Sequence, residues 1–370
     1  MTTFTMLPND LVLNCLARVS RLYYPTLSIV SKRFPSLLAS VELYQTRDLL
    51  DRTESCLYVC LGLASYYGRQ RWFTLCRRPN SSKKVLVPIT SPDSPTYQTD
   101  FARVGSKIYA IGGHINNNDD NASPSVMVMD CRSHTWSNAP SMFVARGAPS
   151  VCVLDGKIHV FGGCKNLDAT NWMEVFDTNT QTWEFAPSSS LDEKICSSFR
   201  YQSFAYDGNV YVNPFGKPEI FYKMVNKGRW RAGDLALAQP WICLSPYCVM
   251  ENVLYSYLYG RIRWYDSQVK CWKEVEGLES LFSIPRYTSK LADYGGKLAV
   301  LWDDNACGQS GPPYNARTLN ECQPDTNIFC AEISLEKRQG GTIWGTLEYL
   351  DVVYTTNEPY IVAHVVAATI

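Results

Sequence analysis

The sequence contains no long apolar run and no excess of charge of either sign. No stretch approaches the roughly 20 consecutive apolar residues that span a bilayer, and the N-terminal segment MTTFTMLPNDLVLNCL lacks the basic start of a secretory signal. Lysine plus arginine and aspartate plus glutamate number 35 each among 370 residues, so no global field attracts nucleic acid or an anionic membrane. We expect a soluble protein of the cytoplasm, the nucleus or both, with neither nucleic acid nor a membrane as partner.

Residues that usually carry chemistry are few or unsuitably spaced. There are only four histidines, no C-x-x-C pair occurs, and Cys56 and Cys60 have no histidine at zinc spacing. The fourteen cysteines are scattered, many of them in apolar runs, which favours reduced and buried thiols. The segment NNNDDN could hold a hard cation, although adjacent acids in such turns are more often solvated. The sequence therefore predicts no metal, no cofactor and no enzymatic activity.

One short phrase occurs twice in the chain. Lys107–Gly113 reads KIYAIGG and Lys157–Gly163 reads KIHVFGG. A phosphate-binding loop would need a helix directly after the glycines to point backbone amides at the anion, but loop-like sequence follows both copies. The phrase instead predicts a β-strand whose glycines permit a sharp turn or the close approach of a neighbouring backbone.

A second pattern gives the period of this repeat. An aliphatic strand ends in aspartate and a tryptophan follows six residues later, as in VMVMD with Trp136, MEVFD with Trp183 and IRWYD with Trp272. With Trp230, which lacks the aspartate, the steps are 47, 47 and 42 residues. This period suits a four-stranded blade, which is stable only between neighbours in a ring. We expect the aspartate to close a hairpin and the tryptophan to fill the wedge between blades.

The combined pattern of strand, Gly-Gly and aliphatic-Asp-x5-Trp resembles the kelch repeat, which implies an all-β propeller, here over residues 46–370. Close copies lie at about 98–145 and 147–195, and degenerate copies at about 199–235, 243–278 and 289–347. The front segment Cys56–Phe73 supplies a sixth candidate blade, and five blades remain the alternative if this segment pairs only with the C-terminal strand. The apolar run Tyr360–Ala367 is expected to be that closing strand.

The first 45 residues follow a different pattern. Three short segments with apolar residues at helical spacing begin near Pro8, Pro25 and Pro35. A module of about 40 residues rarely buries enough apolar surface to fold alone. We therefore expect it to dock on the propeller or to be completed by a partner.

The sequence of this segment resembles the F-box, with Leu-Pro at its start, then an apolar helix, then VSKRF ending at Phe34. Ala39–Leu50 is similar to the segment that closes the F-box in plant F-box/kelch proteins, and Arg71–Pro79 resembles their first blade. Pro35 stands where that family usually has arginine, so the end of the second helix is expected to be shortened or bent. The chain is identified as a member of this family, with a small all-α F-box of three short helices over residues 1–45.

The resemblance implies a substrate receptor of an SCF-type cullin–RING ubiquitin ligase. Its F-box would bind the Skp-type adaptor, and through it the cullin, while its propeller would bind the protein substrate. The alternative function is a kelch interaction scaffold that recruits no ligase. The alternative for each apolar position in the adaptor motif is a place in the core of the module. The positions that match the family's adaptor-contacting motif are Leu7, Pro8, Leu11, Leu16, Leu27, Val30 and Phe34.

Three arginines recur at similar places before the repeat strands. Arg146, Arg200 and Arg286 precede the turn glycine of their own repeats by ten, eight and ten residues. Equivalent places in successive blades predict a common face, where the guanidinium groups would grip an acidic segment of the substrate. The alternative is that each arginine fastens the first strand of its blade through ion pairs or hydrogen bonds.

Overall fold

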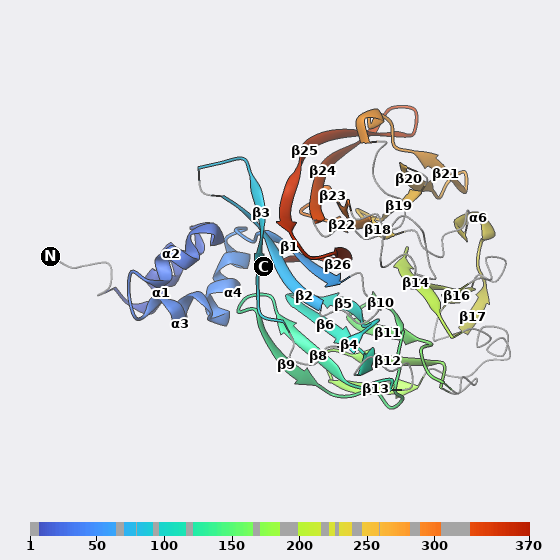
Figure 1. Ribbon diagram of the computed structural model, residues 1–370, viewed down its shortest axis with the longest axis horizontal. Helices are drawn as coiled ribbons and strands as arrows, with labels where there is room; N and C mark the ends of the chain where they lie inside the picture. Colours follow the sequence, from blue (N-terminus) through green and yellow to red (C-terminus); the bar gives the residue numbers. More distant parts are fainter. Residues whose placement is uncertain are drawn as a thin grey trace.

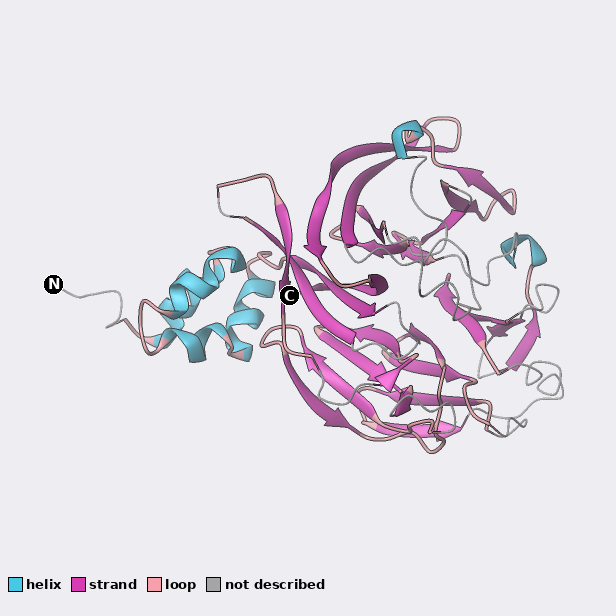
Figure 2. Cartoon of the chain, in the orientation of Figure 1, coloured by secondary structure: helices cyan, strands magenta, loops and turns pink. Residues whose placement is uncertain are grey.

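The computed structural model places a helical module at the N-terminus and a ring of six four-stranded antiparallel sheets after it (Figure 1). Helix is almost confined to that module, and the ring is built of strands and loops (Figure 2). The structure describes residues 7–370 except 64–69, 79, 92–95, 116–120, 166–170, 186–198, 216–221, 226–228, 239–245, 259, 282–288 and 305–325. The predicted architecture of short helices followed by a propeller is confirmed.

The helical module contains more helices than the sequence suggested. Its elements are α1 (Asn9–Ala17), the 3-10 turn η2 (Arg21–Tyr23), α2 (Tyr24–Ser28), α3 (Phe34–Leu38) and α4 (Val41–Leu49). The third predicted segment is divided into α3 and α4 because Ser40 is extended and its hydroxyl accepts a hydrogen bond from the Leu43 amide, which caps a new helix. Pro35 lies in the first turn of α3, where a missing N–H is tolerated.

Six blades form the ring, so the five-blade alternative is wrong. Blade 1 has the strand order β26 (Tyr360–Thr369), β1 (Ser55–Leu63), β2 (Gln70–Arg77) and β3 (Lys84–Pro88). Blade 2 consists of β5 (Asp100–Val104), β6 (Lys107–Ile111), β8 (Val126–Asp130) and β9 (Thr135–Ala139). Blade 3 consists of β10 (Ser150–Leu154), β11 (Lys157–Phe161), β12 (Met173–Asp177) and β13 (Thr182–Phe185). Blade 4 consists of β14 (Tyr201–Tyr206), β15 (Asn209–Pro214), β16 (Tyr222–Val225) and β17 (Arg229–Ala232). Blade 5 consists of β18 (Tyr247–Met250), β19 (Val253–Leu258), β20 (Arg261–Asp266) and β21 (Cys271–Glu274). Blade 6 consists of β22 (Lys290–Asp293), β23 (Leu298–Asp303), β24 (Thr326–Arg338) and β25 (Thr342–Thr356). Smaller elements are the ribbon of β4 (Thr96–Tyr97) with β7 (His114–Ile115), the helix α6 (Leu235–Ala238) and the 3-10 turn η4 (Glu279–Leu281).

The two ends of the chain close the ring within blade 1. β26 pairs antiparallel with β1 from Ser55 opposite Thr369 to Leu63 opposite Tyr360, and the two strands run side by side near the centre in Figure 1. The first strands of the sheets (β26, β5, β10, β14, β18 and β22) contact one another in turn around the centre. The predicted closing strand is therefore confirmed, and closure pairs the edge of β1 that would otherwise stay open.

Each blade has two ends, and we name each end for the kind of connection that joins the strands there. At the hairpin end, short connections join the third strand to the fourth and, in blades 2 to 6, the first strand to the second. The carboxylates of Asp130, Asp177 and Asp266 close such turns by accepting backbone amides, from Arg132 at 2.9 Å, Asn179 at 2.9 Å and Gln268 at 3.0 Å. At the loop end, longer connections join the second strand to the third and lead to the next blade.

The recurring tryptophans lie between blades, as expected. The indole N–H of Trp136 donates to the carbonyl of Thr90 at 2.9 Å, and that of Trp183 donates to the carbonyl of Pro140 at 2.8 Å. Each acceptor belongs to the connection that leaves the preceding blade. The tryptophan thus fills the wedge with its ring and ties two blades together with its one polar group.

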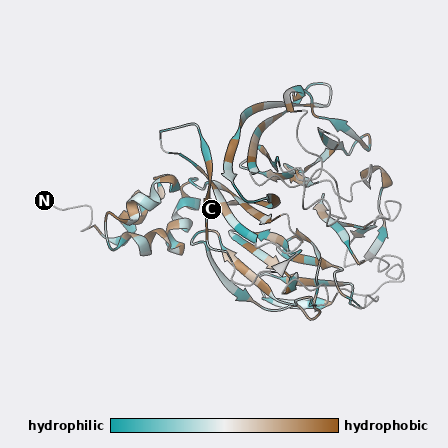
Figure 3. Ribbon diagram, in the orientation of Figure 1, coloured by the Kyte–Doolittle hydropathy of each residue, from teal (hydrophilic) through white to brown (hydrophobic). Residues whose placement is uncertain are grey.

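The helical module docks on the hairpin end of blades 1 and 2. One core cluster combines helical residues such as Leu16 and Phe34 with blade residues such as Tyr58 and Met129. Polar contacts reinforce this packing, because the Tyr44 hydroxyl donates to the carbonyl of Arg132 at 3.2 Å. Figure 3 shows apolar residues on the helices and along the strands of the ring. The module is therefore completed by the propeller, one of the two outcomes expected for so small a unit.

Candidate protein-binding surfaces

The seven positions predicted to contact an adaptor separate into buried and exposed sets. Leu16 and Phe34 lie in the core of the module. They therefore stabilise the fold of the module on which the exposed positions lie. Leu7 and Leu27 are partly buried and pack against that core. The exposed positions are Pro8, Leu11 and Val30.

The exposed positions belong to two segments that the structure holds together. The guanidinium of Arg33 donates to the carbonyl of Leu7 at 3.0 Å and to the side chain of Asn9. This contact fixes the start of α1 beside the turn that follows α2. We name the exposed residues Pro8, Leu11, Ile29 and Val30 the apolar face of the module.

Ile29 is the member of the apolar face that sequence reasoning missed. Its side chain is 84% exposed, more than Val30 at 63% and Leu11 at 54%. The helical spacing of Leu27, Val30 and Phe34 selected only every third or fourth residue and passed over Ile29. Two adjacent β-branched residues before a turn were the available signal.

Buried polar groups that no motif in the sequence predicts attach the module to the propeller. The guanidinium of Arg47, 1% exposed, donates to the carbonyl of Val19 at 2.8 Å and pairs with Glu54 at 2.7 Å. Glu54 also accepts the backbone amide of Arg21 at 3.1 Å, and Arg21 reaches the carbonyl of Cys131 in blade 2 at 3.3 Å. This network joins helices, linker and propeller.

The three predicted substrate-binding arginines have different environments. Arg146 has no exposed surface and pairs with the equally buried Glu174 at 2.8 Å, and it also donates to the carbonyls of Gly162 and Asn171. It therefore behaves as the alternative interpretation expected, as a fastening group inside blade 3. Arg200 is exposed at the loop end of blade 4, directly before β14. Arg286 lies outside the described residues.

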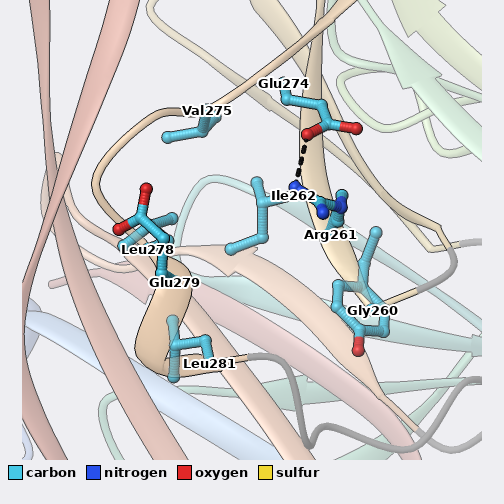
Figure 4. Close-up of a pocket in the computed structure, with 9 residues that line it drawn as sticks. Gly260, Arg261, Ile262, Glu274, Val275, Leu278, Glu279 and Leu281 are labelled. Carbon is cyan, nitrogen blue, oxygen red and sulfur yellow. Dashed lines mark hydrogen bonds and ion pairs between the residues drawn. The ribbon is translucent and has the colours of Figure 1, made fainter.

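A small cavity lies at the loop end of blade 5. Its volume is about 30 Å³, and its lining residues include Ile262, Val275, Leu278 and Leu281. Arg261 and Glu274, which also line it, form an ion pair at 2.7 Å (Figure 4). Pockets for small organic ligands measure roughly 300–1,000 Å³. This cavity is therefore too small for such a substrate.

Burial shifts the pKa of three histidines and of one aspartate among the described residues. Burial lowers the pKa of His134 and His159 to about 4 and that of His364 to about 3, so these rings are neutral near pH 7. Burial raises the pKa of Asp100 to about 6, and its carboxylate accepts the amides of Phe101 and Val151. No group of three or more histidine, cysteine, aspartate or glutamate side chains suited to a metal occurs in this part of the chain.

The chain matches two protein families in the order that the fold shows. Residues 4–46 match the F-box domain, and residues 72–354 match the FKB95 Kelch-repeats domain. It is 49% identical to the F-box/kelch-repeat protein At4g33900 of Arabidopsis thaliana, over 96% of this chain and 93% of that protein. It is 53% identical to the putative F-box/kelch-repeat protein At3g43710 of the same plant, over 99% of this chain and 93% of that one. The chain belongs to the F-box/kelch-repeat family.

In this F-box/kelch-repeat protein, the paired glycines of the repeat join the loop ends of neighbouring blades. The amide of Gly113 donates to the carbonyl of Arg146 at 2.8 Å, and the amide of Gly163 donates to the carbonyl of Phe199 at 2.9 Å. All four glycines of the two pairs have positive φ, and a Cβ on Gly112 would lie 2.6 Å from the Arg146 carbonyl. The glycines are thus structural and allow the close approach that the sequence suggested.

Among the described residues, no helix is long and apolar enough to cross a bilayer.

Proposed function

We propose that this F-box/kelch-repeat protein is the substrate-recognition subunit of an SCF-type cullin–RING ubiquitin ligase. Its F-box binds the Skp-type adaptor, and through it the cullin, while its kelch propeller binds the protein to be ubiquitinated. The polypeptide performs no chemistry of its own, since ubiquitin transfer belongs to other subunits. Its place of action is the cytoplasm, the nucleus or both, and residues 1–45 are proposed as the F-box and 46–370 as the propeller.

The apolar face of the F-box is the observation that carries this proposal. Leu16 and Phe34 are buried in the core that the module shares with the propeller, whereas Ile29 and Val30 are among the most exposed apolar side chains of the described chain. Single exposed apolar residues are ordinary, whereas the adjacent pair Ile29 and Val30, in the segment whose Arg33 holds the start of α1 through the Leu7 carbonyl, offers a partner a larger apolar surface. A scaffold without ligase recruitment has no need of this face.

The rigid attachment of the F-box also supports a receptor. A ligase subunit has to hold its substrate at a set distance and orientation from the adaptor. The contacts of Arg47, Glu54 and Arg21 join the F-box to blades 1 and 2 without a free linker between them. The loop ends of the blades stay uncovered by the F-box, because it contacts the hairpin ends.

Binding to the purified Skp-type adaptor tests the proposal. We expect the double variant Ile29→Asp with Val30→Asp to bind about a hundredfold more weakly or worse, because each buried aliphatic side chain contributes ~1.5–3 kcal/mol and ~1.4 kcal/mol is a factor of ten. The matched control is Val269→Asp, a 60% exposed valine in a hairpin turn of blade 5. Titration calorimetry gives the affinities, and adaptor binding equal in both variants would remove the main support for ligase recruitment.

A further inference from the structure

Two cysteines occupy matching places on neighbouring strands of blade 1. Cys56 lies near the start of β1 and Cys76 near the end of β2, so both are at the hairpin end, where the F-box docks. The two strands pair antiparallel, and the pair nearest this end is Tyr58 opposite Thr74. The register of the strands, continued by two residues, sets Cys56 opposite Cys76.

The two side chains are on the same face of the sheet. Side chains alternate along a strand, so Cys56 shares the face of Tyr58 and Cys76 shares the face of Thr74. Residues that pair opposite each other also share a face. The Cα atoms of such residues lie about 4.5–5.5 Å apart, within the roughly 4.4–6.8 Å that a disulfide spans. A disulfide therefore fits once the pairing extends to the two cysteines, which are both half-buried free thiols.

The F-box holds Cys56 in its reduced form. The Arg21 guanidinium donates to the Cys56 sulfur at 3.2 Å, and its other terminal nitrogen donates to the carbonyl of Cys131 in blade 2 at 3.3 Å. A guanidinium beside a cysteine stabilises the thiolate, which is the form that oxidants attack. Cys56 is therefore suited to react first.

Cys76 is suited to react second. Burial, followed by the charge of Cys56, raises the pKa of the Cys76 thiol, while Arg21 acts in the opposite direction. The Cys76 thiol is thus protonated near pH 7, and it reacts only when an oxidised sulfur lies beside it. Cys60 and Cys131, which belong to the same core cluster, have no exposed surface, so Cys76 is the partner that a soluble oxidant and Cys56 can both reach.

We propose that Cys56 and Cys76 form a reversible disulfide that acts as a redox switch at the junction of the F-box and the propeller. Hydrogen peroxide is the oxidant. The Cys56 thiolate attacks one peroxide oxygen, the O–O bond breaks, hydroxide leaves, and the sulfur becomes a sulfenic acid. The Cys76 sulfur then attacks the sulfenic sulfur, so that the S–S bond forms, the S–O bond breaks, and the oxygen leaves with the Cys76 proton as water.

The whole step converts two thiols and one hydrogen peroxide into one disulfide and two waters. A dithiol reductant returns the two electrons by thiol–disulfide exchange. Disulfides inside reducing compartments are usually transient and serve redox sensing or catalysis. The site is therefore compatible with cysteines that are otherwise kept reduced.

The disulfide changes how firmly the F-box is held. Its formation turns the Cys56 sulfur from Arg21 toward Cys76, and the guanidinium loses its sulfur acceptor while its bond to the Cys131 carbonyl remains. Arg21 belongs to η2, next to the helices α1 and α2 of the F-box. Oxidation thus loosens the F-box on the propeller, a property that goes beyond the partners that either part binds.

Peptide mapping of the full-length protein tests the disulfide. The chain is reduced, freed of reductant, treated with a small molar excess of hydrogen peroxide, alkylated, and digested with trypsin under non-reducing conditions. We expect the peptides of residues 53–69 and 72–77 to be linked through Cys56 and Cys76, with the link lost after dithiothreitol. A link from Cys56 to Cys131, or oxidation without a link between Cys56 and Cys76, would overturn the proposal.

Serine variants assign the two roles. In Cys76→Ser the sulfenic acid on Cys56 has no thiol to resolve it, so dimedone should label Cys56 after peroxide treatment. In Cys56→Ser, Cys76 should stay unlabelled, and its labelling would refute the roles. Cys271→Ser, which removes an exposed thiol of blade 5, is the matched control and should form the disulfide as wild type does. If a variant does not melt as wild type, the peptide map of the wild-type chain decides.

Amide hydrogen exchange measures the effect on the F-box. We expect the F-box amides to exchange about fivefold faster in the oxidised chain than in the reduced chain, because one contact that fixes the module is lost. Dithiothreitol should restore the slow exchange, and peroxide should not accelerate exchange in Cys56→Ser. Equal exchange in the oxidised and reduced wild-type chains would show that the disulfide is no switch.

Discussion

Arg146 and His159 show how burial decides what a polar residue does in this propeller. Arg146 was expected at a binding face because its offset recurs between repeats, but an offset does not distinguish a side chain that points outward from one that points inward. Glu174, which has no exposed surface, forms an ion pair with this arginine, and no sequence motif predicts that pair. His159 lies at the strand position that holds Tyr109 in the preceding blade, and it is 6% exposed.

His159 gives the protein a defined acid sensitivity. Burial lowers its pKa from 6.5 to about 4, so the unfolded chain takes up the proton first as pH falls. Its contribution to stability is complete above pH 6.5 and is lost as pH falls from there through 4. Because one pKa unit corresponds to about 1.4 kcal/mol, the loss attributable to His159 is ~3 kcal/mol.

The variant His159→Tyr, which copies the preceding repeat, should therefore lose less unfolding free energy than wild type between pH 7 and pH 4. Asp100 acts in the opposite direction, since its pKa is raised to about 6 and protonation below that value favours the folded state. Asp100 is present in both proteins, so the difference between them isolates His159. Urea denaturation at a series of pH values measures it, and parallel curves for the two proteins would contradict the assignment.

At the scale of elements, the structural features that recur in each blade could be predicted from the sequence, and the features that occur once could not. The Asp-x5-Trp spacing and the Gly-Gly strand ends identified blades 2 and 3. They recur because each blade has to close a hairpin turn and fill the space that separates it from its neighbour. The break between α3 and α4 depends on one serine cap, at Ser40, within a segment that reads as one amphipathic helix. The exposed Phe143 and Phe185 follow no period, since their place depends on loops held by residues distant in sequence.

Gly112 and Gly105, two glycines of blade 2, allow the two costs of a glycine substitution to be separated. Gly112 has φ +63 and a Cβ there would lie 2.6 Å from the Arg146 carbonyl, while Gly105 has φ +58 and open space around its Cβ position. Left-handed backbone costs about 1–2 kcal/mol in either alanine variant. Overpacking against the next blade should add about 1–3 kcal/mol in Gly112→Ala alone.

We expect Gly112→Ala to be clearly less stable than Gly105→Ala in equilibrium urea denaturation. The Gly105 variant is the matched control for backbone strain without the contact between blades. Equal losses in the two variants would show that the close approach of blades 2 and 3 contributes nothing to stability.

At the scale of the whole molecule, both the F-box and the ring depend on the junction in blade 1. Glu54 exchanges backbone hydrogen bonds with Ile370 at 2.8 and 3.0 Å, directly beside the carboxylate contacts that hold the F-box. β26 thus closes the propeller and supports the base of the F-box at the same time. Ile370 and Ala368 belong to the core cluster that the helices share with the blades.

Removal of residues 359–370 should therefore damage both parts. The truncation takes away the innermost strand of blade 1, exposes the edge of β1, and uncovers core residues such as Val59 and Leu61, which have no exposed surface in the intact chain. We expect an insoluble or rapidly proteolysed product with reduced adaptor binding. A synthetic peptide of residues 359–370, added during refolding, should restore part of the soluble protein, because it can pair with β1 in the register of the native strand. A truncated chain that is soluble, melts cooperatively and binds the adaptor as wild type does would show that the ring does not need its closing strand.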